Sequence, residues 1–202
     1  ILVDDGSTDG TREWLAGLSQ RTVSRSNPPP SVHCRVHLNE RNLGFAATCN
    51  RGAASASGEI LFFLNNDLVF LPRWLEPMLA AFARFPAAGL VGNVQLNHAT
   101  GAVDHTGIFF NHKGKPEHDT RRGPGLPDCR PVTALTGACF GVRRSRWVQL
   151  GGFDEGFVNG CEDIDLCLRA AQLGLVNYVA RRSGVRHHIS ASTGRKLRDE
   201  QN

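Results

Sequence analysis

An unbroken apolar run near the middle of the chain, Ile60–Leu64, stops abruptly at Asn65, Asn66 and Asp67. A run without polar alternation is typical of a strand that is buried on both faces, as in an α/β sheet. Open sheets of this class bind ligands in the crevice beyond the carboxyl ends of their strands. Asp67 is therefore predicted to lie at the mouth of such a sheet, where its carboxylate can hold a metal ion.

The start of the chain repeats this arrangement of strand, acid and helix. Ile1–Val3 has the character of a buried strand, and Asp4 and Asp5 follow it in a loop of Gly, Ser and Thr residues that suit a helix start. Apolar residues at helical spacing begin at Trp14. Aspartate and glycine after a strand are often turn residues, so Asp4 and Asp5 taken alone support a structural role equally well.

A third acidic cluster lies further along the chain. Glu162, Asp163 and Asp165 stand at the start of a segment whose apolar residues recur at helical spacing. Acidic side chains are stabilised at a helix start by the helix dipole and by unpaired amide groups, so these residues also have a purely structural explanation. The recurrence of strand-end and helix-start acids along one chain nevertheless favours a common site.

Taken in order, these segments resemble the landmarks of family 2 glycosyltransferases with the GT-A fold, and among them the rhamnosyltransferase-like enzymes of bacterial surface polysaccharides. The landmarks are Val3–Thr11, Asn42–Ala47, Asn65–Asp67, Gly151–Asp154, Glu162–Leu166 and Arg169. The resemblance covers nearly the whole chain and implies an α/β fold with a mostly parallel central sheet flanked by helices. The family's usual first strand precedes the segment that starts at Val3, so the sheet is expected to lack its N-terminal edge.

The resemblance also implies a reaction. The family moves a sugar from a nucleotide-diphosphate donor to a hydroxyl of a glycan or glycolipid acceptor, and it inverts the anomeric carbon. On the matching positions the catalytic acids are Glu162 and Asp163, with Asp163 as the general base. A base on that side of the sugar makes the acceptor oxygen a competent nucleophile.

The same resemblance assigns two further groups of residues. The nucleotide side receives Asp4, Asp5 and Asn66, whose oxygens can accept hydrogen bonds from the base or the ribose. The weaker candidates for contact with the acceptor or the diphosphate are Gly137, Arg169 and His188.

A metal site is expected at Asp67 and His187. A carboxylate and an imidazole suit Mn²⁺ or Mg²⁺ better than a thiolate-bound metal. His187 matches the family position better than its neighbour His188, and the choice between them stays open. Asn65 and Asn66 leave Asp67 as the sole carboxylate of this motif.

Other functions are compatible with clustered acids. A non-catalytic nucleotide- or glycan-binding module is one alternative, and a metal-dependent phosphohydrolase is another, although the chain has no nucleophilic Asp-x-Asp pair at the strand end. Neither a Gly-x-Gly-x-x-Gly nor a Gly-x-x-x-x-Gly-Lys fingerprint occurs, so kinase and hydride-transfer functions have little support.

Length and composition bound the organisation of the chain. With 202 residues, of which 41% are hydrophobic, the chain is long enough for one sizeable core and too short for two ordinary domains. We expect a single catalytic domain over residues 1–202, truncated at its N-terminal edge, with a nucleotide-binding half at 1–91 and an acceptor-binding half at 92–202.

Charge and cysteine usage suggest the surroundings of the protein. The net charge is +4, and arginines gather late in the chain, from Arg121 to Arg198. This pattern indicates a solvated surface, or a rim that suits a diphosphate or an anionic membrane surface, whereas no nucleic-acid motif is present. The six cysteines form no C-x-x-C pair and no zinc-ligand spacing. We expect reduced thiols, a cytoplasmic location and peripheral association with the cytoplasmic face of a membrane.

Residues 92–131 form the least regular stretch, rich in His, Gly, Pro and Arg. Long aperiodic segments are often functional, so an acceptor-facing lid is predicted here, with His105, His112 and His118 as exposed loop residues. Strand character returns over 132–140, where Gly137 allows close approach of the backbone to a substrate.

Overall fold

In the computed structural model, the apolar run forms strand β3 (Ile60–Leu64), as its sequence predicts. Leu61 and Phe63 are buried in the larger of two hydrophobic cores, and Ile60 and Phe62 pack against the smaller one. Successive side chains of a strand point to opposite faces of the sheet, so each face of β3 covers its own core. The predicted burial on both faces is therefore confirmed for Ile60–Phe63, with Ile60 and Phe62 half-buried, and is wrong for Leu64, which is 43% exposed.

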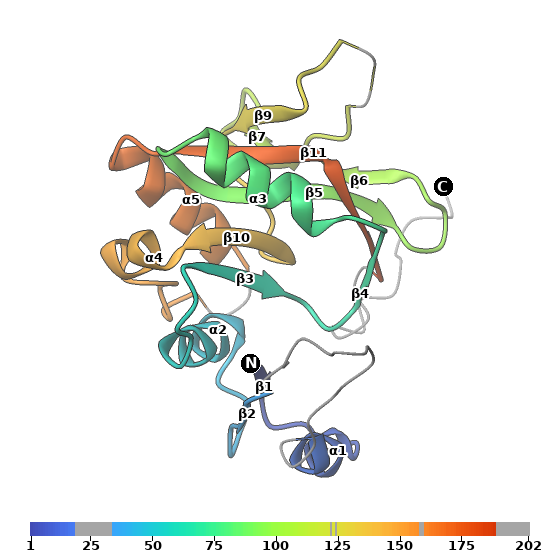
Figure 1. The fold of residues 1–202 in the computed structure, drawn as a ribbon, viewed down its shortest axis with the longest axis vertical. Helices are drawn as coiled ribbons and strands as arrows, with labels where there is room; N and C mark the ends of the chain where they lie inside the picture. The colour runs from blue at the N-terminus through green and yellow to red at the C-terminus, as the bar shows by residue number, and fades with distance from the viewer. Residues whose placement is uncertain (19–33, 122, 124, 158–159, 189–202) are drawn as a thin grey trace.

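The structure describes residues 1–18, 34–121, 123, 125–157 and 160–188 (Figure 1). In chain order the elements are β1 (Leu2–Asp4), α1 (Thr11–Leu18), β2 (Val36–Leu38), α2 (Phe45–Ala54), β3, β4 (Leu68–Phe70), α3 (Leu75–Arg84), β5 (Ala88–Asn97), β6 (Val103–His105), β7 (Ile108–Phe110), β8 (Pro116–His118), β9 (Cys129–Val132), β10 (Cys139–Arg143), α4 (Arg144–Leu150), α5 (Glu162–Gln172) and β11 (Val176–His187).

The main sheet has seven strands in the order β3-β10-β5-β11-β4, with β6 beside β5 and β9 beside β11. Strands β5 and β11 are parallel, and the other described pairs of this sheet are antiparallel. The expectation of a mostly parallel sheet is therefore wrong, and the sheet is mixed. Apolar patterning reports the burial of a strand but not its direction, because a strand buries the same side chains in either orientation.

In the described part of the chain, β1 and β2 form a second, parallel sheet of two strands, with Leu2 opposite Val36. Ile1 is 48% exposed and Leu2 is 38% exposed, so the expected burial of Ile1–Val3 is wrong for the first two residues. Within the described residues β1 has a strand neighbour on one side only. The side chains of Ile1 and Leu2 are therefore only partly covered by other elements. Its carboxyl end still places Asp4 in a buried position.

The described part of residues 92–131 has more regular secondary structure than the sequence predicts. Strand β5 starts before this segment, is buried over almost its whole length and occupies the centre of the sheet. Asn93 and Gln95 are buried polar residues that interrupt its apolar pattern, so the sequence does not predict this strand. His105 is 1% exposed, contrary to the expectation of a loop histidine. The strand predicted over 132–140 is also divided, because β9 ends at Val132 and β10 begins at Cys139.

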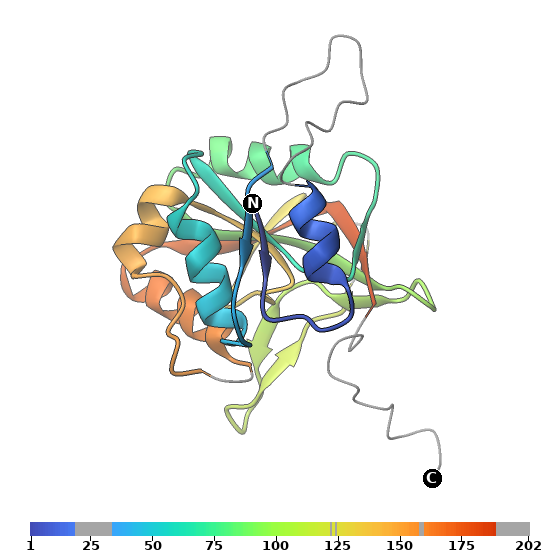
Figure 2. The ribbon, with the colours of Figure 1, turned by 90° about the horizontal axis from the view of Figure 1, so that it is seen from below.

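Helices cover both faces of the main sheet. Side chains of α2, α4 and α5 belong to the larger core, and those of α3 belong to the smaller core (Figures 1 and 2). None of the described helices is long and apolar enough to cross a membrane. All six cysteines have free thiols. The arginine-rich stretch after His188 lies outside the described residues.

Candidate active site

Strands β4 and β11 bring Asp67 and His187 together across the end of the sheet. The two strands are antiparallel, with His187 opposite Leu68, and the amide of His188 donates to the carbonyl of Asp67 at 3.0 Å. This register places His187 Nε2 3.2 Å from Asp67 Oδ1, and both side chains are 14% exposed. The predicted partners, 120 positions apart in the sequence, are therefore neighbours in space.

This pair fits a divalent cation. Asp67 Oδ1 is buried and makes no well-aligned hydrogen bond, although the imidazole nitrogen lies within contact distance. A buried carboxylate oxygen without a partner, beside an imidazole nitrogen, is the kind of donor pair that Mn²⁺ or Mg²⁺ can satisfy. In the part of the chain that the structure describes, no group of three or more His, Cys, Asp or Glu side chains could hold a metal. Such an ion would thus need further ligands from a substrate or from water.

His188 occupies a different position from His187. Its ring is exposed and stacks on the ring of His98, with 3.5 Å between the centroids. The geometry supports His187 as the ligand to a cation at Asp67, because His187 is the residue whose ring nitrogen approaches the carboxylate.

Asp163 lies in the first turn of α5, where its carboxylate accepts two backbone hydrogen bonds. The amide of Gly137 donates to Oδ2 at 2.6 Å, and the amide of Ile164 donates to Oδ1 at 2.8 Å. Burial raises the pKa of Asp163 above its ordinary value, and these hydrogen bonds limit the rise. A carboxylate with a raised pKa is a better proton acceptor, which suits a general base.

Glu162 precedes Asp163 and is 8% exposed. Burial raises the pKa of Glu162, and the neighbouring carboxylate of Asp163 adds to the rise. Two adjacent acids with raised pKa values at one helix start are typical of a functional site, although structural acids can show the same shift.

The end of β3 connects the Asp67 region with Asp163. The amide of Asn65 donates to the carbonyl of Ala138 at 2.9 Å, and Ala138 follows Gly137, whose amide binds the Asp163 carboxylate. The carboxyl end of β3 and the segment before β10 thus carry the two groups at the same edge of the sheet. This arrangement supports the expectation that residues 67, 163 and 187 form one site.

Gly137 contacts the protein rather than an open space. A Cβ atom at this position would lie 3.2 Å from Phe45 Cε1 and 3.4 Å from Asp163 Cβ. The close approach that the sequence predicts is therefore one between Gly137 and the side chains that frame the site.

Gly137→Ala is expected to lower the free energy of unfolding by about 1–3 kcal/mol, because the added methyl group overpacks against Phe45 and Asp163. Urea denaturation measures the change. Gly17→Ala is the matched control, since Gly17 lies in α1 with nothing near its added Cβ. That control is expected to gain roughly 0.5–1 kcal/mol. Equal effects at both glycines would contradict the proposed crowding.

Both N-terminal aspartates already have partners inside the chain. Asp4 accepts from the amides of Gly6 and Ser7 and from the guanidinium of Arg12. Burial would raise the pKa of Asp4, but the bonds from Ser7 and Gly6 and the charge of Arg12 hold the pKa below its ordinary value. The carboxylate therefore stabilises the loop after β1, and a role toward a nucleotide stays a prediction.

Asp5 connects the β1 loop to the start of α2. Its carboxylate accepts from Asn39 Nδ2 at 2.8 Å and from the amides of Leu43 and Gly44 at 2.8 and 2.9 Å. Burial would raise the pKa of Asp5, and these hydrogen bonds lower it below its ordinary value. Asn66, the third predicted nucleotide residue, is exposed beside Asp67.

Arg169 holds a turn in place. Its guanidinium pairs with Asp165 one turn earlier in α5 and donates to the carbonyls of Leu150 and Gly152. These contacts join α5 to the glycine turn after α4. A role of Arg169 toward the acceptor or the diphosphate stays a prediction.

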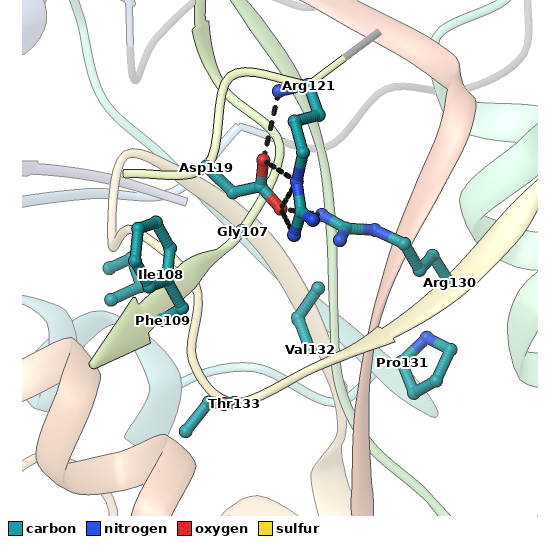
Figure 3. A pocket seen from close by; sticks show the side chains of 9 residues that line it. All are labelled: Gly107, Ile108, Phe109, Asp119, Arg121, Arg130, Pro131, Val132 and Thr133. Atoms are coloured by element: carbon teal, nitrogen blue, oxygen red, sulfur yellow. Dashed lines mark hydrogen bonds and ion pairs between the residues drawn. The ribbon is translucent and has the colours of Figure 1, made fainter. Parts of the chain in front are cut away.

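A pocket of about 340 Å³ lies away from Asp67, among strands β7 and β9 and the residues after β8 (Figure 3). The residues that line it are Gly107, Ile108, Phe109, Asp119, Arg121, Arg130, Pro131, Val132 and Thr133. Figure 3 shows the guanidiniums of Arg121 and Arg130 beside the Asp119 carboxylate. Asp119 Oδ2 pairs with them at 2.7 and 2.8 Å. The pocket therefore lies within residues 92–202, the half of the chain that is predicted to bind the acceptor.

Asp119→Asn is expected to lower the free energy of unfolding at pH 7 by about 2–3 kcal/mol, because Arg121 and Arg130 lose the buried carboxylate that pairs with both of them. Hydrogen bonds from Arg121 hold the pKa of Asp119 well below its usual range. The stabilisation is thus complete above the unfolded pKa of about 3.9 and declines as the pH falls toward the native pKa. Urea denaturation at several pH values tests this: a difference between the two proteins that does not shrink in acid would contradict it.

Two interactions in this half of the chain have no signal in the sequence. Asp119, which follows β8, pairs with Arg130 of β9, and His118 Nδ1 of β8 lies 3.2 Å from the carbonyl oxygen of Asp104 in β6. Each pair depends on how hairpins fold back on the sheet. Sequence periodicity describes each residue separately, so it does not predict these contacts.

Known proteins of similar sequence point to one family. A profile described as Glycosyl transferase family 2 matches residues 1–146. The chain is 35% identical to the O-antigen biosynthesis protein RfbC of Myxococcus xanthus over 73% of its length, which is 12% of that protein. It is 31% identical to the N-acetylglucosaminyl-diphospho-decaprenol L-rhamnosyltransferase of Mycobacterium tuberculosis over 96% of its length, which is 68% of that protein.

A solved structure shows the fold. The crystal structure of GalNAc-T7 with UDP, GalNAc and Mn²⁺ is similar to this chain with a TM-score of 0.72 and 18% identity, covering 92% of this chain and 37% of that one. The expected GT-A fold is confirmed. The chain spans only 12% of RfbC and 37% of GalNAc-T7. The family profile and the rhamnosyltransferase match show that the chain belongs to glycosyl transferase family 2.

Proposed function

We propose that the chain is an inverting glycosyltransferase that moves a sugar from a nucleotide-diphosphate donor to a hydroxyl of a glycan or glycolipid acceptor. The observation that supports this proposal is the contact between Asp67 and His187, together with the backbone hydrogen bonds that link the end of β3, through Ala138 and Gly137, to the Asp163 carboxylate. A site for a cation and a site for a base are the groups that sugar transfer from a diphosphate requires.

Asp163 is the base in this mechanism. Its carboxylate takes the proton of the acceptor hydroxyl while the acceptor oxygen forms a bond to the anomeric carbon, and the bond from that carbon to the diphosphate oxygen breaks. Attack from the side opposite the leaving group inverts the anomeric centre. The hydrogen bonds from Gly137 and Ile164 orient the carboxylate for this proton transfer.

Asp67 and His187 would hold Mn²⁺ or Mg²⁺ on the donor side. When bound, the cation supplies positive charge that stabilises the departing diphosphate. The GalNAc-T7 structure contains UDP and Mn²⁺, which supports this assignment.

The nucleotide and the acceptor are assigned to different halves of the chain. We assign residues 1–91, with Asp4, Asp5 and Asn66, to the nucleotide, and residues 92–202 to the acceptor. A glycolipid acceptor would place the enzyme at the cytoplasmic face of a membrane. The names of RfbC and the mycobacterial rhamnosyltransferase support a role in polysaccharide biosynthesis.

A donor panel tests the function. The protein is incubated with uridine, thymidine and guanosine diphosphate sugars, with and without Mn²⁺, in the presence of glycan and polyprenyl-diphosphate acceptors, and the anomeric configuration of each product is read by NMR. We expect a product of inverted configuration with one donor. A retained configuration would contradict the role of Asp163. Nucleotide binding without transfer in any mixture would favour a binding module, and phosphate release from simple esters would favour a phosphohydrolase.

A further inference from the structure

The pocket shown in Figure 3 has a charged end and an apolar wall. Asp119, Arg121 and Arg130 gather at the charged end, and Ile108 and Phe109 lie to one side of it. The volume of about 340 Å³ is at the lower end of the roughly 300–1,000 Å³ that small-molecule sites occupy, which suits a single sugar ring. Phe109 is 39% exposed, so part of its ring can pack against the C–H groups of such a ligand.

The charged end of the pocket has an excess of positive charge. Asp119 Oδ2 pairs with Arg121 at 2.7 Å and with Arg130 at 2.8 Å. Among the described residues that line the pocket Asp119 is the sole acid, so two guanidiniums share one carboxylate and a net charge of +1 remains. Hydrogen bonds from Arg121 and Arg130 hold the pKa of Asp119 well below its usual range. The carboxylate therefore stays ionised and keeps both guanidiniums in place.

Both arginines keep donors that the protein does not use. Arg130 donates to Asp119 and to the carbonyl of Thr106 through Nη2, and Arg121 donates to Asp119 through Nε and Nη2. No described residue accepts a hydrogen bond from Nη1 of either arginine. The fork of a guanidinium matches the oxygens of a carboxylate or of a phosphate group. The charged end of the pocket thus suits an anionic group.

The pocket is connected to the Asp163 site by a short piece of chain. Thr133 lines the pocket, and Gly137, four residues later, donates its amide to the Asp163 carboxylate. Four residues span no more than about 14 Å even when the chain is fully extended. A glycan of a few sugar units bridges such a distance, so one acceptor molecule can reach both places.

We propose that this pocket binds an acidic sugar of the acceptor, one that carries a carboxylate or a phosphate group. The guanidiniums of Arg121 and Arg130 bind the acidic group, and Phe109 packs against the sugar ring. The assignment of this sugar to the acceptor rests on the proposed function. Binding of an acidic sugar in the pocket does not rest on it and needs neither a donor nor a metal ion.

An NMR titration of the full chain tests the binding in the absence of donor and metal. Backbone amide signals are followed while D-glucuronate, D-glucose 6-phosphate, D-glucose or inorganic phosphate is added. We expect at least one acidic sugar to shift the signals of Gly107 and Thr133 with an affinity about tenfold or more above that of glucose, because hydrogen bonds between charged groups distinguish the two. The tighter of the two acidic sugars identifies the preferred group.

Three results of this titration would overturn the inference. They are equal affinity for glucose and the acidic sugars, equal affinity for inorganic phosphate and the acidic sugars, and no shift at Gly107 or Thr133 with any of them.

Arg121→Gln tests the charged end of the pocket. The variant is expected to bind the acidic sugar about tenfold more weakly and still to fold, because the Arg121 side chain is 74% exposed and Arg130 still pairs with Asp119. Arg182→Gln is the matched control, since the Arg182 side chain is also 74% exposed, pairs with Asp128 and does not line the pocket. Urea denaturation checks the folding of both variants. An affinity that is unchanged in Arg121→Gln, or that falls equally in Arg182→Gln, would contradict the proposed site.

Transfer assays test the assignment to the acceptor. One acceptor is a disaccharide with glucuronate at the end remote from the reacting hydroxyl, and its counterpart has glucose there. In the parent we expect a KM about tenfold lower for the acidic acceptor, with a difference that shrinks in Arg121→Gln and persists in Arg182→Gln. Equal KM values in the parent would overturn the assignment to the acceptor. Binding of the acidic sugar at the pocket without transfer of any sugar would instead reject the proposed function.

Discussion

Asp163→Asn is expected to lower kcat for sugar transfer on the order of a thousand-fold and to leave the affinity for the donor nearly unchanged. Asparagine has the shape of aspartate, and its carbonyl oxygen can still accept a hydrogen bond from the amide of Gly137 or of Ile164. The amide cannot take up the acceptor proton. The variant thus removes the proposed base and keeps most of the local structure. Initial rates at saturating substrate and a donor-binding titration separate the two effects.

Asp128→Asn is the matched control for this variant. Asp128 is an exposed aspartate whose ion pair with Arg182 lies on the surface, so its loss is expected to leave kcat within about twofold and to change stability little. A transfer rate in Asp163→Asn close to that of the control would remove Asp163 from the mechanism. A donor affinity that falls together with the rate would show that Asp163 supports the structure of the site.

Asp67→Ala is expected to abolish the rise in melting temperature that a nucleoside diphosphate and Mn²⁺ together produce. It is also expected to lower kcat/KM by about a hundred- to a thousand-fold, as loss of a charge-stabilising group does. The substitution deletes the carboxylate whose buried oxygen lacks an aligned hydrogen bond and leaves His187 as a single ligand. Thermal shift assays with and without Mn²⁺ measure the first effect.

Two further variants make this test specific. His187→Ala is expected to weaken the same Mn²⁺-dependent rise, because His187 supplies the second donor. His112→Ala, which changes an exposed histidine, is expected to leave the rise intact. A full Mn²⁺-dependent rise in Asp67→Ala would mean that the cation binds elsewhere.

Local patterns in the sequence predict much of this site. The apolar run that ends at Asp67 and the acids that open α5 are both confirmed as a strand end and a helix start. The contact between Asp67 and His187 follows only from the family resemblance, since nothing local in the sequence links two residues so far apart. The antiparallel pairing of β4 with β11 is what produces the contact.

The features that the sequence does not reveal depend on long-range packing. The sequence does not reveal β5 because Asn93 and Gln95 are buried polar residues within it. The side-chain nitrogen of Asn93 donates to Cys139 Sγ on the neighbouring strand β10, while its Oδ1 is buried without a hydrogen-bond partner. The direction of β10 is set by its chain connections and not by its composition. The Asp104–His118 contact likewise forms only when two hairpins meet.

The most direct test of one shared site is paramagnetic line broadening by Mn²⁺ in the presence of a nucleoside diphosphate, observed on backbone amides. We expect the signals of Leu68 and His188 to lose intensity first and that of Gly137 to follow. Val148 is expected to be unaffected, because α4 lies across the molecule from β4 in both views (Figures 1 and 2). Asp67→Ala should abolish the pattern. Broadening centred on α4, or an unchanged pattern in Asp67→Ala, would contradict a cation site shared by Asp67, His187 and the Asp163 region.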